Sequence, residues 1–221
     1  MEEKSILPTI VTTVPWREKI KEADSLGIKE IALFPTFLKK HERPELYRLL
    51  GKSKIERIPF VHIRGDFDLA EMDFLAKEYG SEIFNTHPNE PHPFHEYDKK
   101  IYMENIFFFN EEEFGRYAGI SIDFSHLEND RQLQSARFAH VEKNIASNVV
   151  GCNHIGGITR IAYLREDLNE YRCDSHWLDK ISDLDYLKKY PEKYFSKYIA
   201  LEMENPLETQ LRAKEYILNM F

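Results

Sequence analysis

The sequence of 221 residues predicts a compact (β/α)8 TIM barrel, and three observations lead to this prediction. Eight short apolar runs alternate with helical or loop segments, which is the pattern of a parallel α/β fold, and the count of eight favours a barrel. An open doubly wound sheet is the alternative, but no glycine-rich phosphate loop follows the first run, where such folds usually carry one. Hydrophobic residues make up 42% of the chain, enough for one sizeable core, so we expect residues 1–221 to form a single domain.

The first half of the chain predicts four strands, each an apolar or β-branched run, at residues 8–13, 28–34, 58–63 and 82–86. Helices are expected between them at residues 16–26, 45–50 and 69–79. Gly27 and Gly80 directly follow two of these helices, at the position where glycine most often ends a helix. Residues 88–98 contain three prolines and are therefore expected to form a loop.

The second half predicts four more strands, at residues 101–104, 120–124, 148–153 and 198–202. Helices are expected at residues 111–117, from about 127 to 147, and at 184–194 with an interruption at Pro191; Pro206 opens the last helix. Residues 156–182 are a long mixed segment for which no regular element is predicted. The weak helices after the fourth and fifth strands suit a barrel near the lower size limit of the fold.

Composition excludes several classes of protein. No run of 18 apolar residues occurs, so no membrane span is expected, and the acidic amino terminus lacks the form of a signal peptide. Two cysteines, Cys152 and Cys173, do not make a disulfide framework, which favours the reducing cytoplasm. The net charge of −8 argues against a nucleic-acid partner, although bound divalent ions would offset part of it.

Histidines and carboxylates stand where the predicted strands end. Asp123 and His126 follow the sixth strand, in the stretch Gly-Ile-Ser-Ile-Asp-Phe-Ser-His that begins at Gly119. Taken alone, an Asp in this position more often caps the next helix than binds a metal. Side chains of the same kinds follow the other strands, however: His62, His87, Glu104, His154 and Glu202, with Asp174 and His176 in the long segment after the seventh strand.

A barrel fold would bring these nine side chains to one face. Each could by itself be a surface or turn residue, but in a barrel all the strand ends meet at one face, where active sites lie. Imidazole and carboxylate groups are ligands for divalent ions such as Zn, Mn and Fe. Because buried unpaired carboxylates are costly, metal ions are the natural compensation.

The ordered set resembles that of the xylose isomerase-like barrels, a superfamily that includes sugar isomerases, sugar epimerases and the DNA-repair enzyme endonuclease IV. The resemblance covers nearly the whole chain. The isomerases and epimerases hold one divalent ion, and the resemblance implies these ligands for it: Glu104, Asp123, His154 and Glu202. Endonuclease IV extends this site to three zinc ions, and all nine positions of its pattern are filled here.

The resemblance to endonuclease IV implies three ion positions. The first would be held by His62, His87 and Glu104, and Glu104 would bridge to the second, which is the four-ligand site of the isomerases. The third would be held by His126, Asp174 and His176. Zinc is the ion that we expect first, with up to three ions per chain.

The expected reaction is metal-dependent hydrolysis of a phosphoester, because close divalent ions can flank a phosphate. Glu104 and Glu202 are the expected catalytic carboxylates, and Arg64 is expected to neutralise a phosphate oxygen, with Arg160 and Arg172 as weaker candidates. The expected substrate is a phosphorylated small molecule or a nucleic acid. The segments between the ligands are shorter than in the repair enzymes, which argues against duplex DNA.

Two alternatives remain open at this point. A mononuclear site would perform sugar isomerisation or epimerisation, with Glu104 and Glu202 as acid and base. A barrel that binds a metal or ligand without catalysis is the second alternative. The metal content distinguishes the first two functions, since about three ions favour hydrolysis and about one favours isomerisation. The sequence makes no prediction of the oligomeric state.

Overall fold

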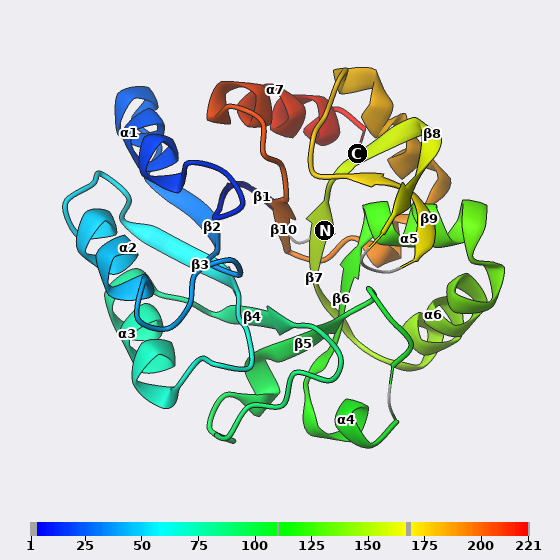
Figure 1. Cartoon of the computed structure of the whole chain (residues 1–221), viewed down its shortest axis with the longest axis horizontal. Coiled ribbons are helices and arrows are strands. Elements are labelled where there is room, and N and C mark those ends of the chain that lie inside the picture. The colour runs from blue at the N-terminus through cyan, green and yellow to red at the C-terminus, as the bar shows by residue number, and fades with distance from the viewer. Residues whose placement is uncertain (1–3, 110, 167–168, 221) are drawn as a thin grey trace.

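A computed structural model describes residues 4–109, 111–166 and 169–220, and its centre is a closed barrel of eight parallel strands (Figure 1). The strands of the barrel are β1 (Ser5–Val11), β2 (Glu30–Phe34), β3 (Arg57–His62), β4 (Ile83–Thr86), β5 (Ile101–Glu104), β6 (Gly119–Asp123), β7 (Val150–Ile155) and β10 (Tyr198–Leu201). Strands β1 to β7 pair in chain order, and β10 closes the barrel between β7 and β1. The predicted (β/α)8 barrel is confirmed, and the doubly wound alternative is excluded.

The helices lie around the outside of the barrel (Figure 1). The α-helices are α1 (Trp16–Leu26), α2 (Arg43–Leu50), α3 (Leu69–Tyr79), α4 (Glu111–Arg116), α5 (Phe124–Leu133), α6 (Ser135–Ser147) and α7 (Leu207–Leu218). The 3-10 helices are η1 (Asp98–Lys100), η2 (Ile181–Lys189) and η3 (Glu192–Tyr194). Within the described ranges, no helix has the length and apolar character needed to cross a membrane.

The predicted ends of α1 and α3 are confirmed. Gly27 and Gly80 have φ values of 68° and 65°, in the left-handed region where glycine carries no steric penalty. The amino-terminal end of α3 is fixed by Asp68, whose side chain accepts a hydrogen bond from the backbone N–H of Glu71 at 2.9 Å.

Two hydrophobic clusters form the core. The larger one contains side chains of the helices together with strand residues such as Ile10, Leu33 and Val61. The smaller one takes the alternate strand positions, which include Phe34 and Phe60, and therefore fills the interior of the barrel. Because successive strand residues point to opposite sides of the sheet, one strand supplies both clusters.

The second half of the chain departs from prediction in three places. The single helix expected over residues 127–147 is two helices, α5 and α6, separated at Gln134, whose φ of −133° is not helical. The seventh strand lies two residues later than the expected 148–153. The expected helix at 184–194 is made of the 3-10 helices η2 and η3, which Pro191 separates, as the predicted interruption indicated.

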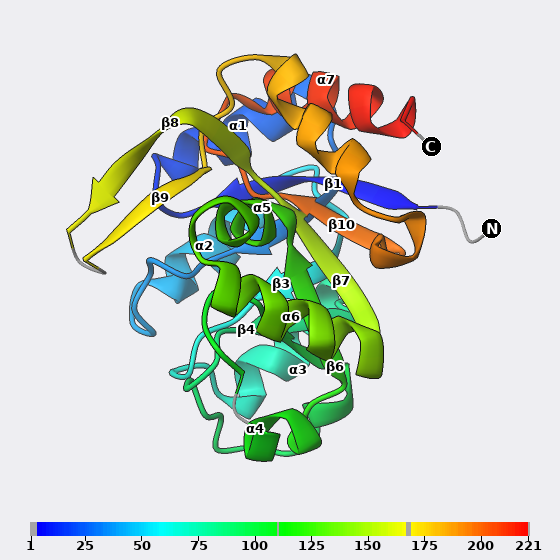
Figure 2. The same cartoon turned by 90° about the vertical axis from the view of Figure 1, so that its right-hand side faces the viewer.

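The long mixed segment after β7 contains an antiparallel hairpin that was not predicted. Its strands are β8 (Gly157–Arg165) and β9 (Glu170–Ser175), and they pair only with each other in the described structure. The hairpin projects beyond the barrel on the side away from the amino terminus, which is the side where the barrel strands end (Figure 2). The base of β9 packs against α5, so the hairpin places Asp174 beside the end of β6.

Candidate metal centre

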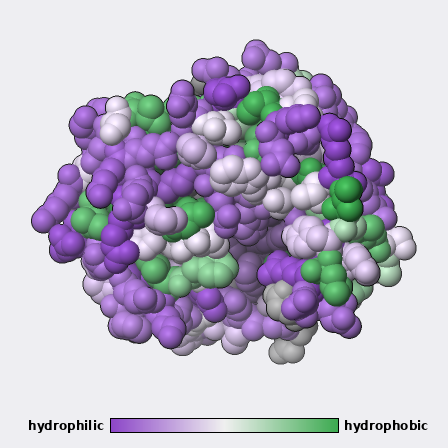
Figure 3. Space-filling model, turned by 45° about the horizontal axis from the view of Figure 1, so that its top comes forward, coloured by the Kyte–Doolittle hydropathy of each residue, from purple (hydrophilic) through white to green (hydrophobic). Residues whose placement is uncertain are grey.

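The ends of the barrel strands bring the predicted ligands to one place. His62, Glu104 and Asp123 are the last residues of β3, β5 and β6, while His154 lies near the end of β7 and Glu202 follows β10. Figure 3 shows a hydrophilic hollow in the face where the strands end, with hydrophobic side chains on both sides of it. Ion-pair distances below 4 Å connect all nine predicted ligands, and the contact between His154 and Glu104 joins the two halves of the set.

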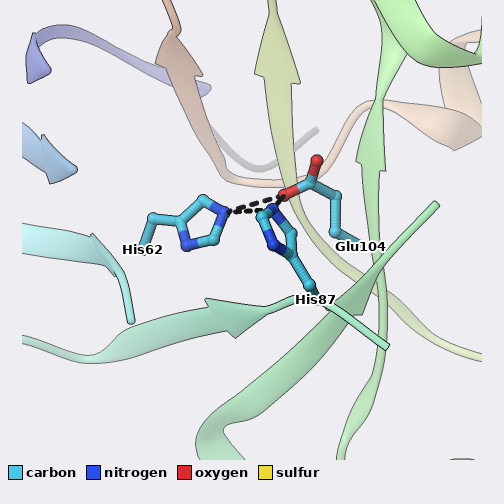
Figure 4. Close-up of side chains that lie close together, drawn as sticks. All are labelled: His62, His87 and Glu104. Atoms are coloured by element: carbon cyan, nitrogen blue, oxygen red, sulfur yellow. Dashed lines mark hydrogen bonds and ion pairs between the residues drawn. The ribbon is translucent and has the colours of Figure 1, made fainter. Parts of the chain in front are cut away.

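His62, His87 and Glu104 form the first group of side chains that could hold an ion (Figure 4). The Nε2 atoms of the two histidines lie 3.1 Å apart, and Oε2 of Glu104 lies 3.0 Å from that of His62 and 3.7 Å from that of His87. The Nδ1 atom of His62 lies 3.1 Å from the carbonyl oxygen of Ile63, and Nδ1 of His87 lies 3.5 Å from Glu90 Oε1. These acceptors favour a proton on each Nδ1, which leaves both Nε2 lone pairs directed at one point, as in histidine metal ligands.

Asp123, His154 and Glu202 form the second group. The Nδ1 atom of His154 lies 3.2 Å from Glu202 Oε2, 3.5 Å from Glu104 Oε2 and 3.8 Å from Asp123 Oδ2. The ring of His154 is completely buried and packs at 4.8 Å, between ring centroids, against Phe34 in the barrel interior. The apolar interior of the barrel therefore supports the base of this group.

Asp123 caps a helix with one carboxylate oxygen and leaves the other available to an ion. Its Oδ1 atom caps α5, since it accepts hydrogen bonds from the backbone N–H groups of Ser125 and His126 at 2.7 and 3.0 Å. Its Oδ2 atom is buried and has no hydrogen-bond partner. The backbone of Asp123 is in turn held by the side chain of Asn105, which accepts from its N–H at 2.6 Å and donates to its carbonyl oxygen at 3.1 Å.

Four buried polar atoms that face this region lack any hydrogen-bond partner: Asp123 Oδ2, His126 Nδ1, His154 Nδ1 and Glu202 Oε2. A buried polar atom without a partner costs about 1–3 kcal/mol, so four of them in one place require a common compensation. Carboxylate oxygens and imidazole nitrogens are also the atoms that ligate Zn, Mn and Fe. The residues present therefore fit a divalent metal ion.

The charges of these side chains depend on one another. Burial alone would raise the pKa of Glu104, but the neighbouring imidazoles of His154, His87, His126 and His62 hold it well below its usual value. Burial would lower the pKa of His126, but Asp123, Glu104 and Asp174 raise it to about 10. The site thus concentrates negative charge that only protonated histidines, or a bound cation, neutralise.

The pKa of Asp123 is shifted in the opposite direction from that of Glu104. Burial raises its pKa, and the neighbouring Glu202 and Glu104 carboxylates act in the same direction against His126 and His154. A cation near its Oδ2 would favour the ionised form.

The third predicted ligand set is not brought together in the same manner. The Nε2 atom of His126 lies 3.4 Å from Asp174 Oδ2, but Nε2 of His176 lies 3.6 Å from Glu202 instead. Both oxygens of Asp174 accept hydrogen bonds from Arg172, at 2.7 and 2.8 Å. Within the described residues, the third group that could hold an ion consists of Glu104, Asp123 and His126.

The arginines expected to bind phosphate point elsewhere. Arg64 is exposed, and its guanidinium donates a hydrogen bond of 2.6 Å to the carbonyl oxygen of Thr36. The side chain of Arg160 is 79% exposed and lies 3.9 Å from Asp183, while Arg172 is completely buried against Asp174. None of the three has a hydrogen bond or ion pair to the two groups of candidate ligands described above.

Sequence reasoning missed the amides that hold the carboxylates. Asn85 Nδ2 donates a hydrogen bond of 3.0 Å to Glu104 Oε2, and Asn105 holds the backbone of Asp123. Both asparagines are completely buried. The only available signal was their position at the ends of β4 and β5, next to the predicted ligands His87 and Glu104.

Comparison with known proteins supports the fold. No family model matches the chain, and no curated protein matches it in sequence. The probable 3-DHS dehydratase AsbF of Bacillus anthracis, involved in petrobactin synthesis, is similar in structure, with a TM-score of 0.50 and 13% identity over 98% of this chain and 99% of that one. At this identity the similarity concerns the fold alone.

Two further solved structures resemble the chain at lower scores. A xylose isomerase-like TIM barrel protein of Mycobacterium smegmatis, in complex with magnesium, has a TM-score of 0.47 and 11% identity over 97% of this chain and 95% of that one. A thiamine phosphate pyrophosphorylase of Pyrococcus furiosus has a TM-score of 0.48 and 14% identity over 100% of this chain and 98% of that one. Fold and site together thus define a (β/α)8 barrel with a buried candidate metal centre at the carboxyl ends of its strands.

Proposed function

We propose that the protein is a divalent-metal-dependent enzyme that moves a proton within a small polyhydroxy carbonyl compound, as in sugar isomerisation or epimerisation. The observation that supports this function is the convergence of Glu104, Asp123 and Glu202 on the buried Nδ1 of His154, at 3.2 to 3.8 Å. A divalent ion bound there would hold two neighbouring oxygens of the substrate and polarise its carbonyl group.

Glu202 is the residue that we assign to proton removal. Its side chain keeps 13% exposure at the hollow, and its Oε2 has no hydrogen-bond partner. Burial would raise its pKa, but His176 and His154 lower it, so the carboxylate is ionised and can accept a proton from a substrate carbon. His176, whose side chain is 33% exposed, lies 3.6 Å from Glu202 and gives the proton a route to solvent.

Glu104 is assigned the second proton transfer. It reaches the group around His154 from β5, while Glu202 reaches it from the end of β10, so the two carboxylates approach from different strands. Asn85 donates a hydrogen bond to Glu104 and fixes its orientation. Two carboxylates positioned around one substrate site can serve as the acid and the base of an isomerisation or epimerisation.

Three observations support this function over the phosphoester hydrolysis expected from the sequence. The arginines expected to bind phosphate point elsewhere, and Arg172 already neutralises Asp174. The net charge of −8 also disfavours a polyanionic substrate. The shared fold with AsbF, described as a probable dehydratase, agrees with a reaction on a carbon skeleton.

Phosphoester hydrolysis by two ions is the second candidate, and the pair formed by His62 and His87 favours it. A mononuclear site leaves these two histidines without a role, whereas two ions bridged by Glu104 would use both. The number of bound ions therefore separates the candidates, with about one expected for isomerisation and about two for this hydrolysis.

The test combines metal content with proton exchange. Purified protein is analysed for bound metals and is then incubated with aldoses and ketoses in deuterium oxide, and deuterium at the substrate carbon is followed by NMR. We expect metal-dependent deuterium incorporation that Glu202→Gln abolishes and that Glu208→Gln, a change at an exposed residue, preserves. Turnover of phosphodiesters without sugar exchange would favour the second candidate. A metal-loaded protein inactive on both panels would indicate a non-catalytic barrel.

A further inference from the structure

Asp174 is neutralised by a side chain of the protein. The guanidinium of Arg172 donates from Nε to Oδ1 at 2.7 Å and from Nη2 to Oδ2 at 2.8 Å, which is the two-pronged geometry that suits a carboxylate best. Arg172 is completely buried, and Asp174 is 4% exposed. Both oxygens of Asp174 are therefore engaged by a cation that cannot leave for solvent.

Acidic side chains around Arg172 stabilise its positive charge. Its Nη1 atom lies 3.9 Å from Glu170 and has no hydrogen-bond partner, and Asp130 adds to the field that favours the cation. Asp130 is paired with a second buried arginine, Arg137, at 2.7 Å. Two buried arginines, the buried carboxylates of Asp130 and Asp174 and the partly exposed Glu170 thus form a nearly balanced network between α5, α6 and β9.

We propose that the guanidinium of Arg172 fills the cation position beside Asp174 that the resemblance to endonuclease IV assigns to a third metal ion. The centre then holds at most two ions, and Arg172 is a positioning residue for it. This inference rests on the proposed function only in taking the groups around Glu104 and His154 as the metal centre.

His126 connects Asp174 with the metal centre. Asp174 Oδ2 lies 3.4 Å from Nε2 of His126, and the opposite atom of the ring, Nδ1, lies 3.2 Å from Glu104 Oε1 and 3.7 Å from Asp123 Oδ2. With Asp174 fixed by Arg172, the ring of His126 presents Nδ1 to the main centre. His126 is thereby a member of the group with Glu104 and Asp123, not the ligand of a separate ion.

The decisive measurement is the number of zinc ions per chain, by elemental analysis after saturation with zinc and desalting. Asp174→Asn keeps the shape of the side chain and removes its charge. We expect its zinc content to equal that of the wild-type protein, because Asp174 holds no ion. A folded Asp174→Asn variant that loses about one ion per chain would overturn the proposal.

A second pair of variants tests whether the loss of Arg172 allows an additional zinc ion to bind. Arg172→Met frees Asp174, so we expect up to one additional zinc ion per chain, and we expect the double variant Arg172→Met/Asp174→Asn not to gain it. A folded Arg172→Met variant without the additional ion would contradict the claim that Arg172 fills the subsite. If Arg172→Met does not fold, the zinc content of Asp174→Asn decides alone.

The two proposals fail in different ways. A wild-type protein that binds no zinc would overturn the proposed metal-dependent function. The assignment of Arg172 would then be decided by whether Arg172→Met gains an ion that the double variant lacks.

Discussion

Glu104 is the residue at which the two groups of candidate ligands meet. Its Oε2 atom lies 3.0 Å from His62 Nε2 and 3.5 Å from His154 Nδ1, and its Oε1 atom lies 3.2 Å from His126 Nδ1. Glu104 is 1% exposed, so its charge is compensated by these neighbours, by His87 and the amide of Asn85, and by any ion that the group holds.

We expect Glu104→Gln to lower the metal content of the purified protein and its affinity for zinc by at least about tenfold. The amide keeps the shape but removes the negative charge that both ligand groups share, and each factor of ten corresponds to about 1.4 kcal/mol. Titration calorimetry with zinc measures the change. Glu56→Gln, at an exposed residue of the opposite end of the barrel, is the matched control and should bind like the wild type.

His92 offers a test of burial that does not involve the metal centre. It is 3% exposed, its Nε2 atom lies 3.0 Å from Thr86 Oγ1, and its ring lies against Phe94. Burial lowers the pKa of His92 from 6.5 to about 4. Its neutral form is therefore the one that the fold accepts.

The direction of the pH effect follows from linkage. Between about pH 6.5 and pH 4, His92 binds a proton in the unfolded chain but not in the folded protein. The contribution of His92 to the free energy of unfolding is therefore fully present above this range and is lost as the pH falls through it. The loss from this group amounts to roughly 3 kcal/mol. Urea unfolding of the wild type and of His92→Gln at pH 7 and pH 4.5, both with chelator, should show a smaller pH dependence for the variant. Equal pH dependence in the two proteins would contradict this assignment.

At the scale of elements, the junction between β6 and β7 sets the spacing of Asp123 and His154. Gly119 begins β6 with a φ of 150°, and a Cβ atom there would collide with the backbone of Val149. The backbone N–H of Ile120 donates to the carbonyl oxygen of Val149 at 2.8 Å, so the two strands are held close at this point.

We expect Gly119→Ala to lower the free energy of unfolding by about 2 kcal/mol or more, because the added methyl group meets backbone that cannot yield cheaply. It should also weaken zinc binding, since a shift of β6 against β7 moves Asp123 relative to His154. Thermal unfolding and zinc titration measure the two effects. Gly115→Ala is the control, because a Cβ at Gly115 has no atom within 4 Å and alanine favours the helix α4. Equal stability of the two variants would refute the proposed collision.

At the scale of the whole molecule, charged and polar side chains gather at one end of the closed barrel. Four buried polar atoms without a hydrogen-bond partner and the buried carboxylates of Glu104 and Asp123 lie at the carboxyl ends of the strands, on top of the apolar interior formed by side chains such as Phe34 and Phe60. These polar groups therefore lower the stability of the folded protein, as groups in functional sites commonly do.

We expect zinc to raise the melting temperature of the metal-free protein by several degrees. Free ion at about 1,000 times its dissociation constant stabilises the folded state by about 4 kcal/mol, because the unfolded chain does not hold the ligands together. Calorimetry with and without chelator measures the shift, and Glu104→Gln should reduce it. A melting temperature that is independent of zinc in the wild type would contradict the assignment of the centre.

The sequence by itself determined the class of fold and, to within two residues, where each barrel strand ends. Strand and helix patterns are local, and parallel strands in a barrel end at one face, so positions such as His62, Glu104 and Asp123 could be assigned without coordinates. The same reasoning located the ends of α1 and α3, because glycine at the carboxyl end of a helix is a local signal.

Only the tertiary structure decided which of these side chains share a point in space. His154 meets three carboxylates because β5, β6, β7 and β10 are neighbours in the closed barrel, and their register brings the strand ends level. In the unpredicted strand β9, Arg172 and Asp174 lie on the same face because they are two residues apart, but only the packing of the hairpin against α5 places this pair beside His126. Distances between side chains from different strands depend on closure and rotamers, whereas the chemistry of each strand end depends only on its own few residues.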